Sequence, residues 1–152
     1  MRGDVMKILQ GKGIIRGRAA GPALITKEPM NFTAAFSKKQ NILFPWLWST
    51  INDRHHELYK KKIKDTIFVY PATIGSTGTG MVLLELITRG QAPAGIIVER
   101  MDTLMISGPV LADIWFEKLM PVVEYSKNDL YESIKNNDKL EIDGYTGEIK
   151  IL

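Results

Sequence analysis

Two short runs of β-branched and aromatic side chains, Thr66–Tyr70 and Gly95–Glu99, constrain the fold of this chain more than any other feature. Runs of this length and composition are typical of buried strands. Between them lie residues 81–89, which are apolar except for one stripe of polar side chains at helical spacing. Strand, helix and strand in this order predict a parallel crossover unit, with the helix ending at Gly90.

Patterns on either side of this unit predict further strands and turns. Residues 14–25 are predicted to form two short strands joined by a bend at Gly21–Pro22, because proline is tolerated mainly at strand edges and bulges. Residues 103–116 are apolar around Gly108–Pro109, which predicts a turn and a short helix. The other expected elements are a strand at 121–125, a helical turn or two at 129–135 and a closing hairpin at 140–151.

Length and composition are those of one ordinary globular domain. The 152 residues are 45% hydrophobic and 24% charged, so we expect a single α/β domain over 1–152 with mixed parallel and antiparallel strands and few helices. Residues 1–12 are a candidate flexible extension. No apolar run approaches the about eighteen residues that span a bilayer, and no signal-peptide pattern is present. We therefore expect a cytoplasmic protein with no membrane partner.

The charged residues carry two further expectations. The net charge is +3, and much of the excess lies in a lysine run at 60–64. No recognition motif or aromatic stacking pattern accompanies the run, so we interpret it as a solvated surface and expect no nucleic-acid partner. Arg16 and Arg18 lie on an expected edge strand, where arginines are usually solvated. The alternative is that they bind an acidic group of a substrate.

The chain contains no cysteine. Within these 152 residues this excludes disulfides, cysteine-ligated zinc, thiol catalysis and an iron–sulfur cluster held by cysteine. The two histidines, His55 and His56, are adjacent, whereas two-histidine metal sites use wider spacing such as i, i+4. We therefore expect this chain alone to hold neither a metal ion nor a cluster.

One segment carries residues suited to chemistry. Gly75–Gly80 reads Gly-Ser-Thr-Gly-Thr-Gly and lies between a predicted strand and the start of a predicted helix. Glycines let a backbone turn tightly, and a helix start offers N–H donors and the positive end of a dipole to a carboxylate or phosphate. The segment is neither a P-loop nor a G-x-G-x-x-G motif. The plainer interpretation is that its Ser and Thr side chains only cap the helix.

Several motifs occur in an order that identifies a family resemblance. They are Gly21-Pro22-Ala23-Leu24, Glu28-Pro29, Asp53-Arg54-His55-His56-Glu57-Leu58, Gly75–Gly80 followed by Leu83-Leu84-Glu85-Leu86, Gly90-Gln91-Ala92-Pro93-Ala94 and 144–149. Together they resemble the small subunit, or swivel domain, of the aconitase X family over roughly residues 13–150. That family includes phosphomevalonate dehydratase of archaea and cis-3-hydroxy-L-proline dehydratase of bacteria.

The resemblance implies a swivelling β/β/α fold and a part in a hydro-lyase that removes water from a hydroxy acid. It implies a large subunit as partner, and an iron–sulfur cluster in that subunit. It places Ser76 at the position of the serine that removes a proton from carbon. The residues it implies near the substrate are Gly75, Thr77, Gly78, Thr79, His55 and His56; for the two histidines the alternatives are contact with the large subunit or a plain surface loop.

Some features depart from the family pattern. Ile74 replaces a basic residue, and residues 36–48 replace a short glycine-containing turn. This longer segment includes Phe44, Trp46 and Trp48, which either fold back on the core or meet the large subunit. The sequence of residues 53–56 more closely resembles the cis-3-hydroxy-L-proline dehydratase branch of the family.

Two functions outside the family also fit the loop. One is a non-enzymatic module that holds an anion or a peptide carboxylate at Gly75–Gly80. The other is a stand-alone hydrolase using Ser76, which is disfavoured because no G-x-S-x-G motif is present.

Overall fold

The computed structural model describes residues 5–36, 47–75 and 77–152. Within these residues it forms an eight-stranded sheet and four helices, which confirms the expected mixed α/β class. In spatial order the strands are β1 (Lys7–Gln10), β8 (Glu148–Ile151), β7 (Lys139–Asp143), β3 (Arg18–Ile25), β4 (Ile67–Ala72), β5 (Gly95–Arg100), β6 (Val122–Glu124) and β2 (Lys12–Ile15). The helices are α1 (Phe32–Phe36), α2 (Thr79–Thr88), α3 (Thr103–Phe116) and α4 (Leu130–Ser133).

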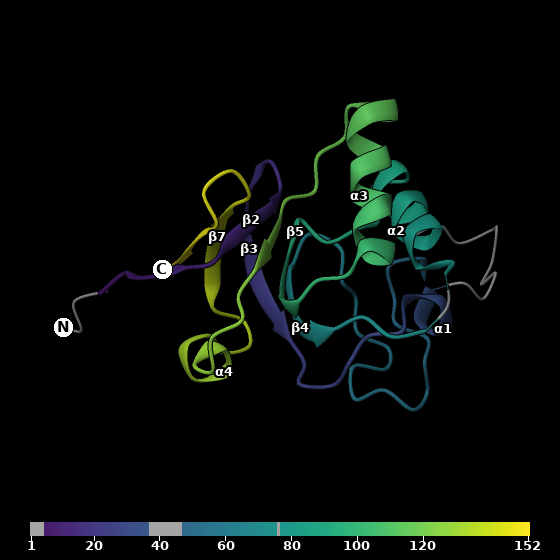
Figure 1. Ribbon diagram of the computed structural model, residues 1–152. Helices are drawn as coiled ribbons and strands as arrows, with labels where there is room; N and C mark the ends of the chain where they lie inside the picture. The colour runs from purple at the N-terminus through teal and green to yellow at the C-terminus, as the bar shows by residue number, and fades with distance from the viewer. Residues whose placement is uncertain (1–4, 37–46, 76) are drawn as a thin grey trace.

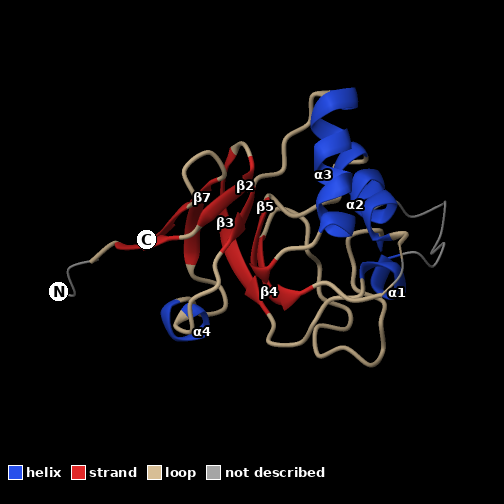
Figure 2. Cartoon of the chain, viewed as in Figure 1, coloured by secondary structure: helices blue, strands red, loops and turns tan. Residues whose placement is uncertain are grey.

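The middle of the sheet is parallel and its flanks are antiparallel. β3, β4, β5 and β6 pair in parallel, whereas β1, β8 and β7 form an antiparallel ribbon that joins β3, and β2 pairs antiparallel with β6. The predicted crossover unit is confirmed as β4–α2–β5. α2 ends at Thr88, and Gly90, with a φ of 68°, follows the C-cap Arg89. Helices α1, α2 and α3 gather on one side of the parallel strands, whereas α4 lies apart from them (Figures 1 and 2).

Alternate side chains of the central strands pack into two hydrophobic clusters. Phe68 and Tyr70 of β4 face the cluster that includes α2 and α3, whereas Ile67 and Val69 face the cluster that includes α4 and the antiparallel ribbon. All four side chains are fully buried. This accounts for the continuous apolar run in β4, because a parallel strand covered on both faces shows no alternation.

The predicted bend at Gly21–Pro22 is wrong. β3 runs unbroken through both residues, and the chain turns earlier, at Gly17, whose φ is 124°. Pro22 is accommodated because the strand changes partner there: residues 18–22 pair with β7, and only from Ala23 on does β3 pair with β4. Pro22 therefore lies in an internal strand at a point where only one edge of that strand is paired with a neighbour.

The predicted turn at Gly108–Pro109 is also wrong, because α3 is one helix through both residues. It begins at the N-cap Asp102, whose carboxylate accepts a hydrogen bond of 2.9 Å from the Met105 N–H. Gly108, Pro109 and Ala112 are buried against the neighbouring elements. Tertiary packing therefore outweighs the local cost of an interior proline.

The expected flexible extension at 1–12 is corrected from Lys7 onward. Lys7–Gln10 forms β1, which pairs antiparallel with β8 from Lys7–Ile151 to Gln10–Glu148. The Gly11 N–H then donates a hydrogen bond of 2.9 Å to the Gly147 carbonyl. Of the residues of β1 only Leu9 is buried, so the sequence offered almost no apolar signal for this strand.

Among the described residues, the structure contains no helix of the length and apolarity that a bilayer crossing requires.

Candidate functional site

The Gly75–Gly80 loop leaves the carboxyl end of β4, the edge at which α/β sheets commonly bind ligands. Backbone hydrogen bonds anchor it to the chain that follows β3: the Met30 N–H donates to the Ala72 carbonyl, and the Ile74 N–H donates to the Met30 carbonyl, each at 2.9 Å. The Tyr70 hydroxyl lies 3.2 Å from the Thr73 hydroxyl and 3.0 Å from the Met105 sulfur. The base of the loop is therefore fixed on both sides.

Gly75 occupies a position that only glycine fits. Its φ is 106°, and a Cβ built on it would lie 2.6 Å from Asn31 Oδ1 and 2.8 Å from Asn31 Nδ2. The Asn31 carboxamide is itself held, because its oxygen accepts a hydrogen bond of 3.0 Å from the Ala34 N–H at the start of α1. Gly75 thus rests on the Asn31 side chain.

Asn31 is a site residue that the sequence interpretation missed. The available signal was an asparagine directly before the apolar segment Phe32–Phe36, which is a common N-cap pattern. The pattern indicates a helix start but gives no hint that the same side chain supports a loop much later in the chain.

The other residues of the loop have distinct positions. Gly78 is the N-cap of α2 and has no side chain, and Thr79 is the first helical residue, with 1% of its surface exposed. Thr77 is exposed, and Ser76 lies outside the described residues. The N-cap of α2 is therefore Gly78 rather than either threonine, and the capping interpretation stays a prediction for Ser76. Gly80 packs against α3, since a Cβ there would lie 2.8 Å from the Leu104 carbonyl oxygen.

The two histidines have different surroundings. His55 is exposed, and its N–H donates to the Asp53 carboxylate at 3.0 Å. His56 is 8% exposed; its Nδ1 accepts a hydrogen bond of 3.1 Å from the Leu58 N–H, and its Nε2 lies 3.7 Å from a carboxylate oxygen of Glu28. The structure thus fixes His56 within its own loop, and only His55 has the exposure that contact with a substrate or partner requires.

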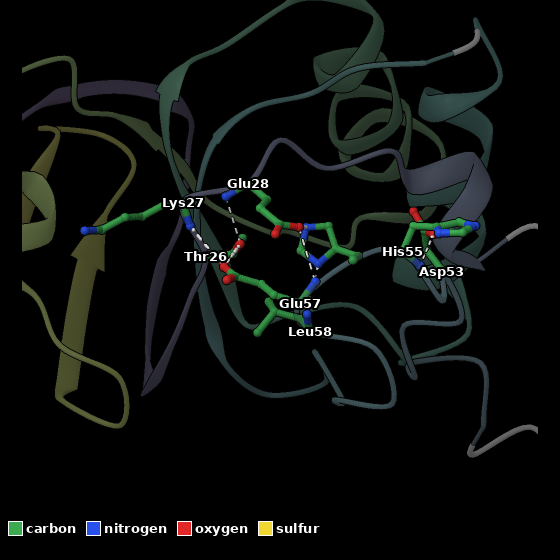
Figure 3. A network of polar contacts seen from close by, with 8 residues as sticks. Thr26, Lys27, Glu28, Asp53, His55, Glu57 and Leu58 are labelled. Carbon is green, nitrogen blue, oxygen red and sulfur yellow. Dashed lines mark hydrogen bonds and ion pairs between the residues drawn. The ribbon is translucent and has the colours of Figure 1, made fainter.

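A polar network joins the 53–58 loop to the end of β3 (Figure 3). The Thr26 hydroxyl donates to the Glu57 carboxylate, and the Glu57 N–H donates to the Glu28 carboxylate at 3.2 Å. Lys27 points away from these carboxylates in Figure 3, and Asp53 and His55 lie apart from them. The network fastens this loop in place, and the sequence interpretation did not identify Glu28 or Glu57 as its anchors.

Arg16 and Arg18 are both ion paired within the chain. Two nitrogens of Arg16 donate to the two carboxylate oxygens of Asp113 at 2.9 Å, and Arg18 Nε donates to Asp143 at 3.0 Å. The hydrogen bond from Arg16 holds the pKa of the Asp113 carboxyl below its usual range. The structure thus engages both arginines with aspartates, which weighs against binding of an acidic substrate group.

Part of the aromatic segment at 36–48 is described. Trp48 packs against the cluster that includes α2, and the Arg89 guanidinium lies 4.1 Å from its ring centroid. Phe36 packs against the same cluster, with its ring stacked on Phe32 at a centroid distance of 5.9 Å. Phe44 and Trp46 lie outside the described residues.

The side chains that the structure describes do not fit a metal ion or a cluster. The chain has no cysteine, and among the described residues no group of three His, Asp or Glu side chains is placed to hold a metal ion.

Comparison with known proteins places the chain among aconitase X relatives. Residues 8–151 match the model of a family described as the aconitase X swivel domain. The chain is 32% identical over 144 residues to a protein of Methanocaldococcus jannaschii named phosphomevalonate dehydratase small subunit, covering 95% of this chain and 97% of that one. It is 29% identical over 143 residues to the protein of the same name from Methanocella arvoryzae, covering 94% and 98%.

Solved structures share the fold. The crystal structure of Thermococcus kodakaraensis aconitase X in its holo form superposes with a TM-score of 0.79 at 24% identity, covering 96% of this chain and 98% of that one. A 3-isopropylmalate dehydratase structure from Methanocaldococcus jannaschii superposes with a TM-score of 0.59 at 15% identity, covering 88% and 75%. The mixed sheet with its helices on the parallel strands is thus the swivel-type fold, and the family match spans nearly the whole chain. This chain belongs to the aconitase X swivel-domain family.

Proposed function

We propose that this chain is the small subunit of a dehydratase that removes water from 5-phosphomevalonate, with Ser76 as the group that accepts a proton from the substrate carbon. The observation that carries the proposal is the Gly75–Gly80 loop, which is held by Asn31 beneath Gly75 and leads directly into α2. The curated relatives named phosphomevalonate dehydratase small subunit support the reaction and the substrate, because they align over almost their full length.

The loop supplies what a serine base needs. A serine hydroxyl loses its proton only where the resulting negative charge is stabilised by positive dipoles and N–H donors. α2 begins at Thr79, so the positive end of its dipole lies at the loop. Gly75 and Gly78 carry no side chains that would keep a substrate from the backbone. These features support a role for the loop in binding an acidic substrate and in stabilising a deprotonated Ser76.

The remaining chemistry belongs to a partner. An iron–sulfur cluster in the large subunit would bind the leaving hydroxyl group, and this chain would contribute the loop. The absence of cysteine supports this division, since the chain has no thiolate ligands for a cluster. Ile74 is 53% exposed and offers no charge beside the loop, so we propose that the phosphate charge of the substrate is met by the large subunit.

Substitution of Ser76 in the reconstituted two-subunit complex tests the proposal. Ser76→Ala should lower kcat by about two or more powers of ten, because a general base typically contributes that much, while subunit association and melting temperature stay close to those of the wild type. Thr77→Ala is the matched control, since Thr77 is exposed in the same loop and should leave kcat within a few-fold. Thr79 is unsuitable as a control because it is buried.

The same assay separates the alternatives. The complex should turn over 5-phosphomevalonate and not cis-3-hydroxy-L-proline. The latter is the substrate that the motif Asp53-Arg54-His55-His56 favours. Dehydration of hydroxyproline alone would overturn the substrate and keep the reaction class. If the complex dehydrates neither compound while the chain alone binds phosphate or a carboxylate, the chain is a binding module. Near-normal turnover of Ser76→Ala with a lowered melting temperature would show that Ser76 has a structural role.

A further inference from the structure

The outer face of α3 is apolar and exposed. Its exposed apolar side chains are Leu104, near the start of the helix, and Ile114, Trp115 and Phe116, in its last turn. We call these four residues the α3 face. Ile114 and Trp115 are 68% and 63% exposed. Helices of soluble proteins ordinarily place charged residues on the side that faces water, so this face is unusual.

Charge is almost absent from this helix. Asp113 is the only charged residue among Thr103–Phe116, and its carboxylate is turned to Arg16, which extends from the end of β2. The α3 face therefore carries no charge along its length. The centres of protein interfaces differ from ordinary surface in composition: they are depleted in charged residues and enriched in tryptophan and phenylalanine.

The exposed area matches an interface better than a solvated surface. Large apolar side chains have areas of ~150–250 Å², so the α3 face exposes on the order of 500 Å². This is near the upper end of the largest apolar patches on monomers, and it is more than half of the ~800 Å² that each partner contributes to a standard interface.

The position of the α3 face points to one occupant. A Cβ on Gly80 would lie 2.8 Å from the carbonyl oxygen of Leu104, so the first residue of the α3 face lies beside the first turn of α2. In Figure 1 both helices rise from the same edge of the sheet, and the last turn of α3 extends beyond α2. A molecule that covers the start of α2 would therefore meet the α3 face first at Leu104, and the other residues of the face lie farther along the same helix. We propose that the large subunit of the dehydratase docks on the α3 face, an inference that rests on the proposed function.

A charge placed within the α3 face tests this inference in the full chain. Ile114→Glu should weaken binding of the wild-type large subunit by about tenfold or more, because a carboxylate at the centre of an interface is desolvated without a partner. Ile8→Glu is the matched control: Ile8 is 49% exposed on β1, at the far end of the sheet, and its substitution should leave the Kd unchanged. Both isolated variants should melt close to the wild type, because both side chains are exposed.

Three results would overturn the inference. The first is binding of Ile114→Glu with the wild-type Kd. The second is a large drop in the melting temperature of isolated Ile114→Glu, which would show that the face is covered within the chain. The third is loss of a dimer of the isolated chain, seen by sedimentation, with normal binding of the large subunit; the occupant would then be a second copy of this chain.

Failure of the proposed function gives a different pattern. Ser76→Ala should bind the large subunit normally and lack turnover, whereas Ile114→Glu should regain most of its turnover at a high concentration of large subunit. A complex that is sensitive to Ile114→Glu but dehydrates neither compound would contradict the proposed reaction and support the docking surface. A wild-type chain that does not bind the large subunit would overturn both.

Discussion

Gly108 of α3 meets the backbone of Gly80 of α2 so closely that a Cβ on Gly108 would overlap the Gly80 carbonyl oxygen. A Cβ on Gly80 would likewise overlap the Ser107 hydroxyl oxygen of α3 and would lie 2.8 Å from the Leu104 carbonyl oxygen. The two helices can approach this closely only because neither position carries a side chain. Gly80 therefore serves helix packing, whereas Gly75 serves the turn of the loop.

This contact predicts that Gly108→Ala lowers the free energy of unfolding. An added methyl group must push α3 away from α2, and overpacking of this kind typically costs about 1–3 kcal/mol. Alanine favours a helix over glycine by only about 1 kcal/mol, which offsets part of the loss. Urea unfolding measures the difference. Ile114→Ala on the same helix is the control and should change stability little, because Ile114 is 68% exposed. An equal or higher stability of Gly108→Ala would contradict the contact.

The two histidines should respond differently to substitution. His56→Ala should destabilise the chain by about 1–3 kcal/mol, because it leaves a small cavity and removes the acceptor of the Leu58 N–H. His55→Ala should change stability by less than about 0.5 kcal/mol, since His55 is exposed. Thermal melts of the isolated chain measure both. If His55 meets the substrate or the large subunit, its substitution raises KM or Kd in the complex; equal destabilisation by both variants would contradict the described loop.

The sequence predicted those features that depend on neighbouring residues. The apolar runs of β4 and β5, the polar stripe of α2 and the glycine that ends it are local patterns, and all are confirmed. The position of the Gly75–Gly80 loop between strand and helix follows from the same patterns.

Features that depend on distant contacts were missed or wrongly predicted. Gly108–Pro109 looks like a turn from its own sequence, and it is helical because Gly108 packs on Gly80. β1 was missed because its partner β8 is at the other end of the chain and supplies backbone hydrogen bonds rather than an apolar pattern. The contact between Gly75 and Asn31 was missed for the same reason, because no sequence periodicity links an N-cap residue to a remote loop.

The Arg16–Asp113 pair predicts a specific dependence of stability on acid. The hydrogen bond from Arg16 lowers the pKa of Asp113 below its ordinary value of 3.8 in the folded chain. A lowered folded pKa contributes stability above the unfolded pKa, and this contribution is lost as pH falls through the folded value. Asp113→Asn should therefore be less stable than the wild type at neutral pH, and the difference should shrink below pH ~3.8.

Urea unfolding at several pH values measures this difference. Arg16→Gln provides the matched variant, because it removes the other half of the pair and should give the same pH dependence. The effect should be modest, since the Arg16 side chain is 59% exposed and surface pairs are screened by solvent. A stability difference that stays constant from neutral pH to pH ~3 would exclude Asp113 as its source.

Gly75 and Asn31 should be energetically coupled. Gly75→Ala brings two penalties: an unfavourable φ of 106°, and a Cβ that would lie 2.6 Å from Asn31 Oδ1. Gly90→Ala carries only the first kind, because Gly90 also has a positive φ, 68°, but nothing lies within 4 Å of its Cβ position. Gly75→Ala should therefore cost more stability than Gly90→Ala, which itself should cost about 1 kcal/mol.

A double-mutant cycle isolates the contact with the Asn31 carboxamide. Asn31→Ala alone should cost about 1 kcal/mol, since it removes the N-cap of α1. In the Asn31→Ala background the methyl group of Gly75→Ala no longer meets the carboxamide, so its cost should fall toward that of Gly90→Ala, a coupling of about 0.5–3 kcal/mol. Gly90→Ala should cost the same in both backgrounds. Additive losses for Gly75→Ala and Asn31→Ala would mean that the loop does not rest on Asn31.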